Sequence, residues 1–283
     1  MPSTELDALS SKVEAVKARW PIYNEIADWL VSLITDTIHA QDRLLLPEIK
    51  LDLDQVNQNL AKGVSVYQPE DLPVDLDSVL GMCARLAEKV AARQGQGAAR
   101  LTELLNGSAE PISELIKALV RSDHDRLTAT AEHCRASQDA LKLMLKLALR
   151  PSLRRLSEAV VAQVDLSQWR YGHCPVCGSA PLVAELAVET GARRLHCGLC
   201  ETAWAYPRLR CPFCENEDTD QLSYTCTKED RGLRLDTCAR CGQSLKCVDL
   251  RHAPGPVIPL LDDLITTHLV YTLAGMEVAQ NQC

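Results

Sequence analysis

The sequence is poor in aromatic residues, in positive charge and in long apolar runs, and each shortage excludes a class of protein. Aromatic residues make up 4% of the 283 residues, with a single phenylalanine, Phe213, whereas strands of sandwiches and barrels favour aromatic side chains. The formal net charge of −8 gives no support to the binding of nucleic acid or of an anionic membrane. No run of 18 apolar residues occurs, so the sequence predicts no membrane insertion.

Export and enzyme motifs are missing as well. Residues 1–20 contain no basic segment followed by an apolar one, so we identify no signal peptide and expect a cytoplasmic protein. The sequence contains no phosphate-binding glycine loop, no HExxH motif and no recognisable pairing of a nucleophile with a base. We therefore expect that the protein is not an enzyme.

Cysteine, in contrast, is abundant. Ten of the thirteen cysteines fall between positions 174 and 247, whereas Cys83 and Cys134 lie upstream and Cys283 is the last residue. In a protein without an export signal, such a concentration indicates metal or redox chemistry rather than disulfides.

The cysteine-rich region divides the chain near Trp169. Residues 1–168 are predicted to form an all-helical domain of about six to eight helices, because apolar residues recur there at helical spacing. One helix is expected over 125–150, and Pro151 is expected to start the next one. The segment from 22 to 38 shows the pattern most clearly, with an apolar stripe of Ile22, Ile26, Trp29, Leu30, Leu33 and Ile38.

From position 169 the helical pattern gives way to short β-prone runs, such as 182–186 and 223–226, between turn residues. We expect two tandem rubredoxin-like or zinc-ribbon β modules over 169–210 and 211–253. Residues 254–283 are expected to form a linker, which contains three prolines, and a C-terminal helix. The predicted fold is thus multi-domain: an α-helical domain, two small metal modules and a closing helix.

Four C-x-x-C pairs are the strongest motif in the chain. Each pair forms a tight turn, called a knuckle below, which places two sulfurs on one side of the backbone. Two facing knuckles supply four thiolates in a tetrahedron, an arrangement that suits zinc or iron. We therefore predict two metal sites with the ligands Cys174, Cys177, Cys197, Cys200, Cys211, Cys214, Cys238 and Cys241.

The spacing leaves two ways to pair the knuckles, and an internal repeat favours one of them. Sequential pairing joins the first knuckle to the second and the third to the fourth, whereas nested pairing joins the two middle ones. Both halves contain the pattern G-x-R-x-x-x-C-x-x-C, which begins at Gly191 and again at Gly232. A repeat indicates that each copy is a complete unit, so we expect each copy to close its own site.

Alternative roles for the cysteines stay open. Zinc with a purely structural role is a serious rival, while disulfides and a thioredoxin-like dithiol fit less well. A nucleic-acid-binding ribbon is disfavoured, because residues 169–253 contain 11 Lys or Arg against 11 Asp or Glu.

Several nearby residues are expected to have ordinary roles. His173 and His196 precede knuckles and are less favoured as ligands than the cysteines. Core positions are expected for a set of small and aromatic residues: Cys83, Cys134, Cys226, Cys247, Trp204, Tyr206 and Pro207. Asp262 and Asp263 are expected to open the last helix and complement its dipole.

These motifs together resemble one family, the formate dehydrogenase accessory proteins known as FdhE. The resemblance lies in CPVCGSAP (174–181), LHCGLC (195–200), RCPFC (210–214), RLDTCARCGQSLKCVDLR (234–251) and DDLITTHL (262–269). It implies a cytoplasmic maturation factor that binds the catalytic subunit of respiratory formate dehydrogenase before export. It also implies rubredoxin-type iron at both four-cysteine sites, with zinc as the alternative. Rubredoxin-like electron transfer is the second function that fits, and self-association into a homo-oligomer stays open.

Overall fold

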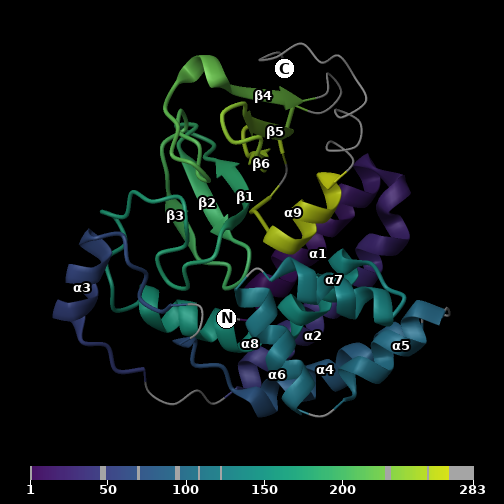
Figure 1. The fold of residues 1–283 in the computed structure, drawn as a ribbon. Coiled ribbons are helices and arrows are strands. Elements are labelled where there is room, and N and C mark those ends of the chain that lie inside the picture. The colour runs from purple at the N-terminus through teal and green to yellow at the C-terminus, as the bar shows by residue number, and fades with distance from the viewer. Residues whose placement is uncertain are drawn as a thin grey trace.

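Helices form the N-terminal part of the chain, and a sheet with one further helix follows them (Figure 1). The structure is a computed structural model that describes residues 2–44, 49–68, 71–92, 96–107, 109–121, 123–226, 231–253 and 255–267. None of the helices in these ranges has the length and apolar character needed to cross a membrane. Within them, the helices that precede the sheet are α1 (Pro2–Arg19), α2 (Asn24–Arg43), α3 (Leu53–Ala61), α4 (Leu76–Ala91), α5 (Gln96–Leu105), α6 (Ala109–Val120), α7 (His124–His133) and α8 (Gln138–Val161).

Short polar side chains begin several of these helices. Asp75 precedes α4 and accepts hydrogen bonds from the N–H groups of Asp77 (3.1 Å) and Ser78 (3.3 Å). Asp123 caps α7 and Ser137 caps α8 in the same way. Each cap satisfies backbone donors that have no partner inside the helix, which explains why the helices start at these positions.

The single helix expected over 125–150 is wrong, because the structure contains a turn between α7 and α8. Arg135 adopts a left-handed backbone with φ of +51°. Ser137 then accepts a hydrogen bond from the N–H of Ala140 at 3.1 Å. A serine side chain competes with the helical hydrogen bonds for backbone donors. The helix is therefore interrupted here, although the helical spacing of apolar residues continues across the turn.

Pro151 does not start a helix, as expected from the sequence, but lies inside α8. A proline inside a helix costs about 3 kcal/mol, because it removes one backbone hydrogen bond. Leu149 and Leu153 on either side are fully buried. Packing therefore holds α8 together across the proline, as is usual for helices whose stability comes from tertiary contacts.

Ile22 was expected in the apolar stripe of the second helix, and this prediction is also wrong. Pro21–Tyr23 forms a short 3-10 turn between α1 and α2, and Ile22 is 87% exposed there. Leu30, Leu33 and Ile38 of the same stripe are buried in α2 as expected.

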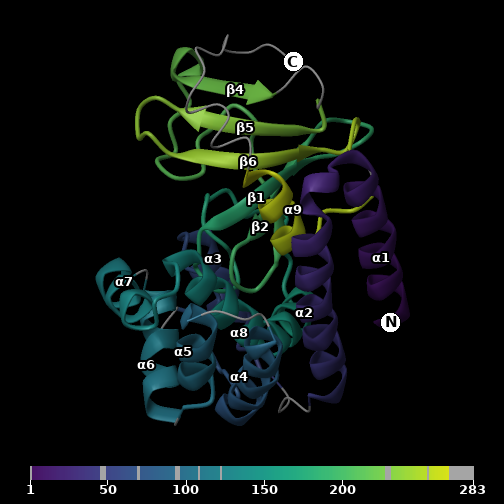
Figure 2. The same ribbon diagram turned by 90° about the vertical axis from the view of Figure 1, so that its right-hand side faces the viewer.

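One six-stranded sheet follows the helices, with the strand order β3-β2-β1-β6-β5-β4 (Figure 2). The β-prone runs at 182–186 and 223–226 are confirmed as β1 and β4. The strands are β1 (Pro181–Leu186), β2 (Arg193–Cys197), β3 (Ala203–Ala205), β4 (Leu222–Cys226), β5 (Leu233–Cys238) and β6 (Ser244–Asp249).

Each sequence repeat contributes three antiparallel strands to this sheet. The first repeat contains β1, β2 and β3, the second contains β4, β5 and β6, and the parallel pair β1–β6 joins them. The first strand of one repeat thus pairs with the last strand of the other. Both repeats therefore run in the same orientation along one continuous sheet.

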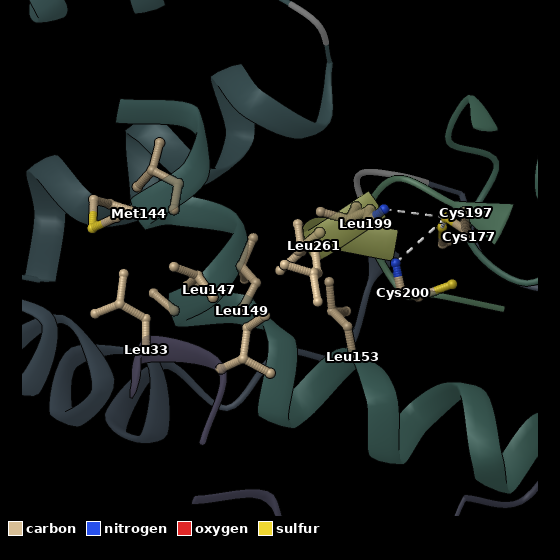
Figure 3. Packing of buried hydrophobic residues seen from close by; sticks show 14 of the residues in the cluster. Leu33, Met144, Leu147, Leu149, Leu153, Cys177, Cys197, Leu199, Cys200 and Leu261 are labelled. Carbon is tan, nitrogen blue, oxygen red and sulfur yellow. Dashed lines mark hydrogen bonds between the residues drawn. The ribbon is translucent and has the colours of Figure 1, made fainter. Parts of the chain in front are cut away.

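The helices and the sheet share one hydrophobic core (Figure 3). Leu149 and Leu153 of α8 belong to the same buried cluster as Leu261 of α9 (Pro259–Ile265) and Leu199 of a cysteine knuckle. Helix α9 confirms the closing helix, whereas the part of the tail from residue 268 onward lies outside the described residues. The shared core ties the first repeat to the helical part of the chain.

A buried ion pair fixes α9 on α1. Lys12 Nζ lies 2.7 Å from the carboxylate of Asp262, and the two side chains are 2% and 0% exposed. Lys12 also donates to the Pro256 carbonyl, and the Ile258 N–H donates to Asp262. Burial raises the pKa of Asp262, so this carboxylate depends on its partners to stay ionised. Its role goes beyond the expected complement to the helix dipole.

Replacing Lys12 with methionine is expected to destabilise the protein by about 3–5 kcal/mol, because Asp262 then stays buried without a counterion. Denaturant unfolding at pH 7 measures the effect. A second replacement, Asp262→Leu, should restore much of the loss. Lys17→Met serves as the control, since Lys17 pairs with exposed acids and should change stability little. A Lys12→Met protein as stable as the wild type would contradict this role.

Candidate metal centres

Four cysteines of the first repeat form one cluster of sulfurs, the first cluster, which consists of Cys174, Cys177, Cys197 and Cys200. One knuckle precedes β1, and the other begins at Cys197, the last residue of β2. The Sγ atoms of Cys174 and Cys200 lie 3.6 Å apart, and those of Cys177 and Cys197 lie 3.4 Å apart. All four side chains are fully buried.

The second repeat builds the second cluster, Cys211, Cys214, Cys238 and Cys241, in the same way. Cys211 Sγ lies 3.7 Å from Cys241 Sγ, and Cys214 Sγ lies 3.8 Å from Cys238 Sγ. The structure therefore groups the knuckles sequentially, as the repeat indicated, and does not nest them.

The sulfur geometry fits a metal better than it fits disulfides. Four thiolates at about 2.3 Å from a central ion define a tetrahedron with edges of about 3.8 Å. The sulfur pairs are separated by 3.4 to 3.8 Å, and within each cluster all four sulfurs lie within 4.8 Å of one another. A disulfide requires about 2.05 Å. Each cluster can thus hold one metal ion, and its donor chemistry suits iron and zinc alike.

The four knuckles share one backbone geometry. In each, the N–H of the first cysteine donates to the carbonyl five residues later, at 2.9 to 3.0 Å: Cys174 to Ser179, Cys197 to Thr202, Cys211 to Asn216 and Cys238 to Gln243. The residue after each second cysteine has a positive φ. These residues are Gly178 (+73°), Glu201 (+59°), Glu215 (+58°) and Gly242 (+71°).

Backbone donors point at the sulfurs. The N–H groups of Leu199 and Cys200 lie 3.3 and 3.4 Å from Cys197 Sγ (Figure 3). In the second cluster the N–H of Phe213 lies 3.4 Å from Cys211 Sγ. Such donors stabilise a thiolate over a thiol, and thiolates are the form that binds metal.

Burial acts against these donors in the first cluster. It raises the pKa of the Cys174 and Cys197 thiols well above their usual range. The pKa of Cys177 is instead lowered, because the neighbouring thiols donate hydrogen bonds to its sulfur. Negative charge on the Cys174 and Cys197 sulfurs therefore requires a cation among them. A bound metal supplies that cation, and metal binding then releases protons and contributes to folding.

The two clusters differ in access to solvent. The first cluster is closed on all sides, because its four cysteines belong to the core shared with α8. In the second cluster Cys211 and Cys238 are buried, but Cys214 and Cys241 are partly exposed. The same motif thus yields one internal and one peripheral centre.

Glu201 fastens the first cluster to the helices. It follows Cys200 directly, and its carboxylate binds Arg150 (2.8 Å) and Arg154 (2.9 Å) of α8. Arg150 is 2% exposed and also binds Glu5 of α1 at 2.7 Å and Thr37 of α2 at 2.8 Å. One buried guanidinium therefore connects three helices with a metal-site knuckle.

Burial alone would raise the pKa of Glu201, but the charges and hydrogen bonds of Arg150 and Arg154 outweigh it. They lower the pKa from 4.5 to about 2. Residues of this network carry no sequence motif, so the sequence did not predict them. One signal in the sequence was Glu201 itself. It occupies the turn position after the second cysteine of its knuckle, and the first and last knuckles have glycine at that position.

The histidines beside the knuckles do not face the sulfurs. His173 Nε2 lies 3.1 Å from the Gly63 carbonyl, and His196 Nε2 lies 3.0 Å from Glu185. Both histidines therefore have structural partners, and the cysteines account for each cluster without them.

The remaining predicted positions are mostly core. The Tyr206 hydroxyl donates to the Cys211 carbonyl at 3.0 Å and thus links the two repeats. Pro207 was expected to pack the same seam, but it is exposed; this prediction is wrong, because the chain turns outward after Tyr206. The predicted core positions that are buried are Cys83, Cys134, Cys226, Cys247, Trp204 and Tyr206.

We predict that Glu201→Gln lowers the free energy of unfolding by about 3 kcal/mol at pH 7, since about 1.4 kcal/mol accompanies each unit of pKa shift. Because the pKa is lowered in the folded state, the stabilisation is present above pH 4.5 and is lost as the pH falls toward 2. The stability difference between wild type and variant, measured by denaturant unfolding, should shrink over that range.

Glu215→Gln is the matched control for this variant. Glu215 occupies the equivalent position of the third knuckle, but its side chain is 42% exposed and pairs with Arg210. Its replacement should change stability little at any pH. Equal losses in the two variants, or a Glu201→Gln effect that persists at pH 2, would contradict the anchoring role.

Comparisons with known proteins agree with this architecture. The family model described as "FdhE, central domain" matches residues 173–208, which contain the first cluster. An FdhE homolog from Aquifex aeolicus is 26% identical over 92% of this chain and 87% of its own length. The FdhE protein of Escherichia coli O1:K1 is 27% identical over 85% of this chain and 75% of its own length.

The crystal structure of the FdhE protein from Pseudomonas aeruginosa has the same fold. It superimposes with a TM-score of 0.64 at 22% identity, over 95% of this chain and 90% of that one. The resemblance found in the cysteine motifs thus extends over nearly the whole chain, which is similar to FdhE proteins in sequence and in fold.

Proposed function

We propose that this protein is a cytoplasmic accessory factor that binds the catalytic subunit of respiratory formate dehydrogenase and is needed for its assembly. The observation that carries the proposal is the pair of tetra-cysteine clusters in a chain that is similar to FdhE proteins over nearly its full length. The role itself follows from the family resemblance of the cysteine motifs. In this proposal the protein acts as a chaperone and not as an enzyme.

The metal we propose for both clusters is rubredoxin-type iron, with zinc as the alternative. Each module, 169–210 and 211–253, would load one ion on its own four cysteines. When bound, iron supplies a centre that can change oxidation state, which zinc cannot do. The chain's own contribution is to hold four sulfurs in place and to aim backbone donors at them.

The exposure of the second cluster favours a redox role as a second candidate function. Cys214 and Cys241 are partly exposed, so a centre there lies within reach of a docked protein. The first cluster is sealed by the core and suits a structural role. An accessory factor could use the peripheral centre to exchange electrons with the subunit that it binds.

Single cysteine variants test whether the two sites load independently. We expect anaerobically purified wild type to contain two metal ions per chain and Cys214→Ser to contain one, because the first cluster stays intact. Cys197→Ser should also leave one ion, in the second cluster, with a larger loss of stability. Elemental analysis with a visible spectrum measures content and identity.

Cys83→Ser is the control for this series, because Cys83 is buried in the helical core outside both clusters. It should retain both ions. Loss of both metals from Cys214→Ser would contradict independent sites. A colourless protein with two zinc ions per chain would exclude iron and the redox role.

Binding of the proposed partner is tested by co-purification. Under anaerobic conditions the tagged chain should retain the catalytic subunit of respiratory formate dehydrogenase, and a second variant, Cys241→Ser, should retain less of it if the second cluster contributes to docking. Absence of the subunit from the wild-type eluate, with both metals loaded, would overturn the proposed function.

A further inference from the structure

A cavity of about 100 Å³ lies beside the second cluster, under the segment that connects the two repeats. Its wall is unusually rich in arginine, with one acid among the described lining residues. The groups that matter are Arg193, Arg208, Arg210, Arg234, Asp236 and Cys211.

Two of these arginines are buried and share a single carboxylate. The side chains of Arg193 and Arg234 are 3% and 8% exposed. Arg234 Nε lies 2.9 Å from Asp236, and Arg193 Nη1 lies 3.5 Å from the same residue. Arg210 adds no free charge, because it pairs with Glu215 and Glu217. The buried group therefore holds two cations and one anion. Arg208 on the same wall forms no ion pair among the described residues, and its charge offsets negative charge that the second cluster carries through Cys211 and Cys238 when a metal is bound.

The remaining contacts of the two arginines do not remove this excess charge. Arg193 donates to the carbonyls of Pro207 and Arg210, which are neutral, and its Nε is buried without a hydrogen-bond partner among the described residues. Arg234 lies over the ring of Tyr224, with its guanidinium carbon 4.6 Å from the ring centroid. Burial raises the pKa of the neighbouring Cys247 thiol to about 12, so that group is neutral too.

An uncompensated buried charge is costly, and it favours the binding of an anion. The size and charge of the cavity limit which anion fits. Its volume corresponds to about three water molecules, and an excess of one positive charge calls for a monoanion. Guanidinium groups match the two oxygens of a carboxylate, and Phe213 and Leu209 add apolar wall.

We propose that this cavity is a binding site for a carboxylate, held by Arg193 and Arg234 beside the second cluster. The carboxylate can belong to a free small acid or to the end of a peptide chain. Leu209 on the wall is 65% exposed, so the cavity is reached from the surface. This site is independent of the proposed function, since it requires neither a metal nor a partner protein.

Titration of the full-length, metal-loaded protein with sodium acetate tests the site, with sodium chloride keeping the ionic strength constant. Acetate should raise the melting temperature of the wild type over the chloride control. Arg234→Gln should weaken acetate binding at least tenfold. Asp236→Asn should strengthen it, because it removes the competing anion, and this opposite sign separates binding from a general loss of folding.

Arg251→Gln is the control, because Arg251 pairs with Asp249 at the end of β6 and does not line the cavity. It should bind acetate as the wild type does. A tripeptide with a free C-terminus, tested beside its amide and beside acetate, separates the two sources. Tighter binding of the free peptide than of acetate indicates a peptide-borne carboxylate. Equal or weaker binding indicates a free acid. The site is overturned if neither acetate nor peptide stabilises the wild type, or if Asp236→Asn weakens binding.

Discussion

The ion pair between Arg150 and Glu201 is the contact on which the arrangement of this protein depends. A guanidinium in the interior requires compensating charge, and Arg150 obtains it from Glu5 of α1 and Glu201 of the second knuckle. Thr37 of α2 completes its hydrogen bonds. The knuckle that carries Glu201 also carries Cys197 and Cys200. The ion pair that neutralises Arg150 in the helical core therefore also fixes the position of the first cluster.

Two copies of one motif have therefore acquired different surroundings. The first repeat packs against α8 and α9, and its cluster lies inside the common core. The second repeat extends the same sheet away from the helices through the parallel pair β1–β6, which leaves its cluster partly exposed (Figure 2). The peripheral copy lies next to the arginine-lined cavity. The chain thus combines a centre that supports the fold with a centre that other molecules can reach.

Local patterns in the sequence predicted the parts of this structure that depend on local spacing. The C-x-x-C turns and the repeat at Gly191 and Gly232 indicated which cysteines meet, and short β-prone runs between turn residues indicated β1 and β4. Pairings between distant segments were not predictable in this way. The β1–β6 pair and the contact of Arg150 with Glu201 join residues that no periodicity relates. Pro151 shows the same limit of sequence-based prediction. Its low helix propensity predicts a helix boundary, whereas tertiary packing continues α8 across it.

We propose that the first metal centre is part of the folding core and that the second is not. Stepwise removal of metal with a chelator, followed by circular dichroism and metal analysis, tests it most directly. We expect one ion to leave first with the helical signal intact, and loss of the other to coincide with unfolding. Removal of both ions with no loss of helical structure would contradict it.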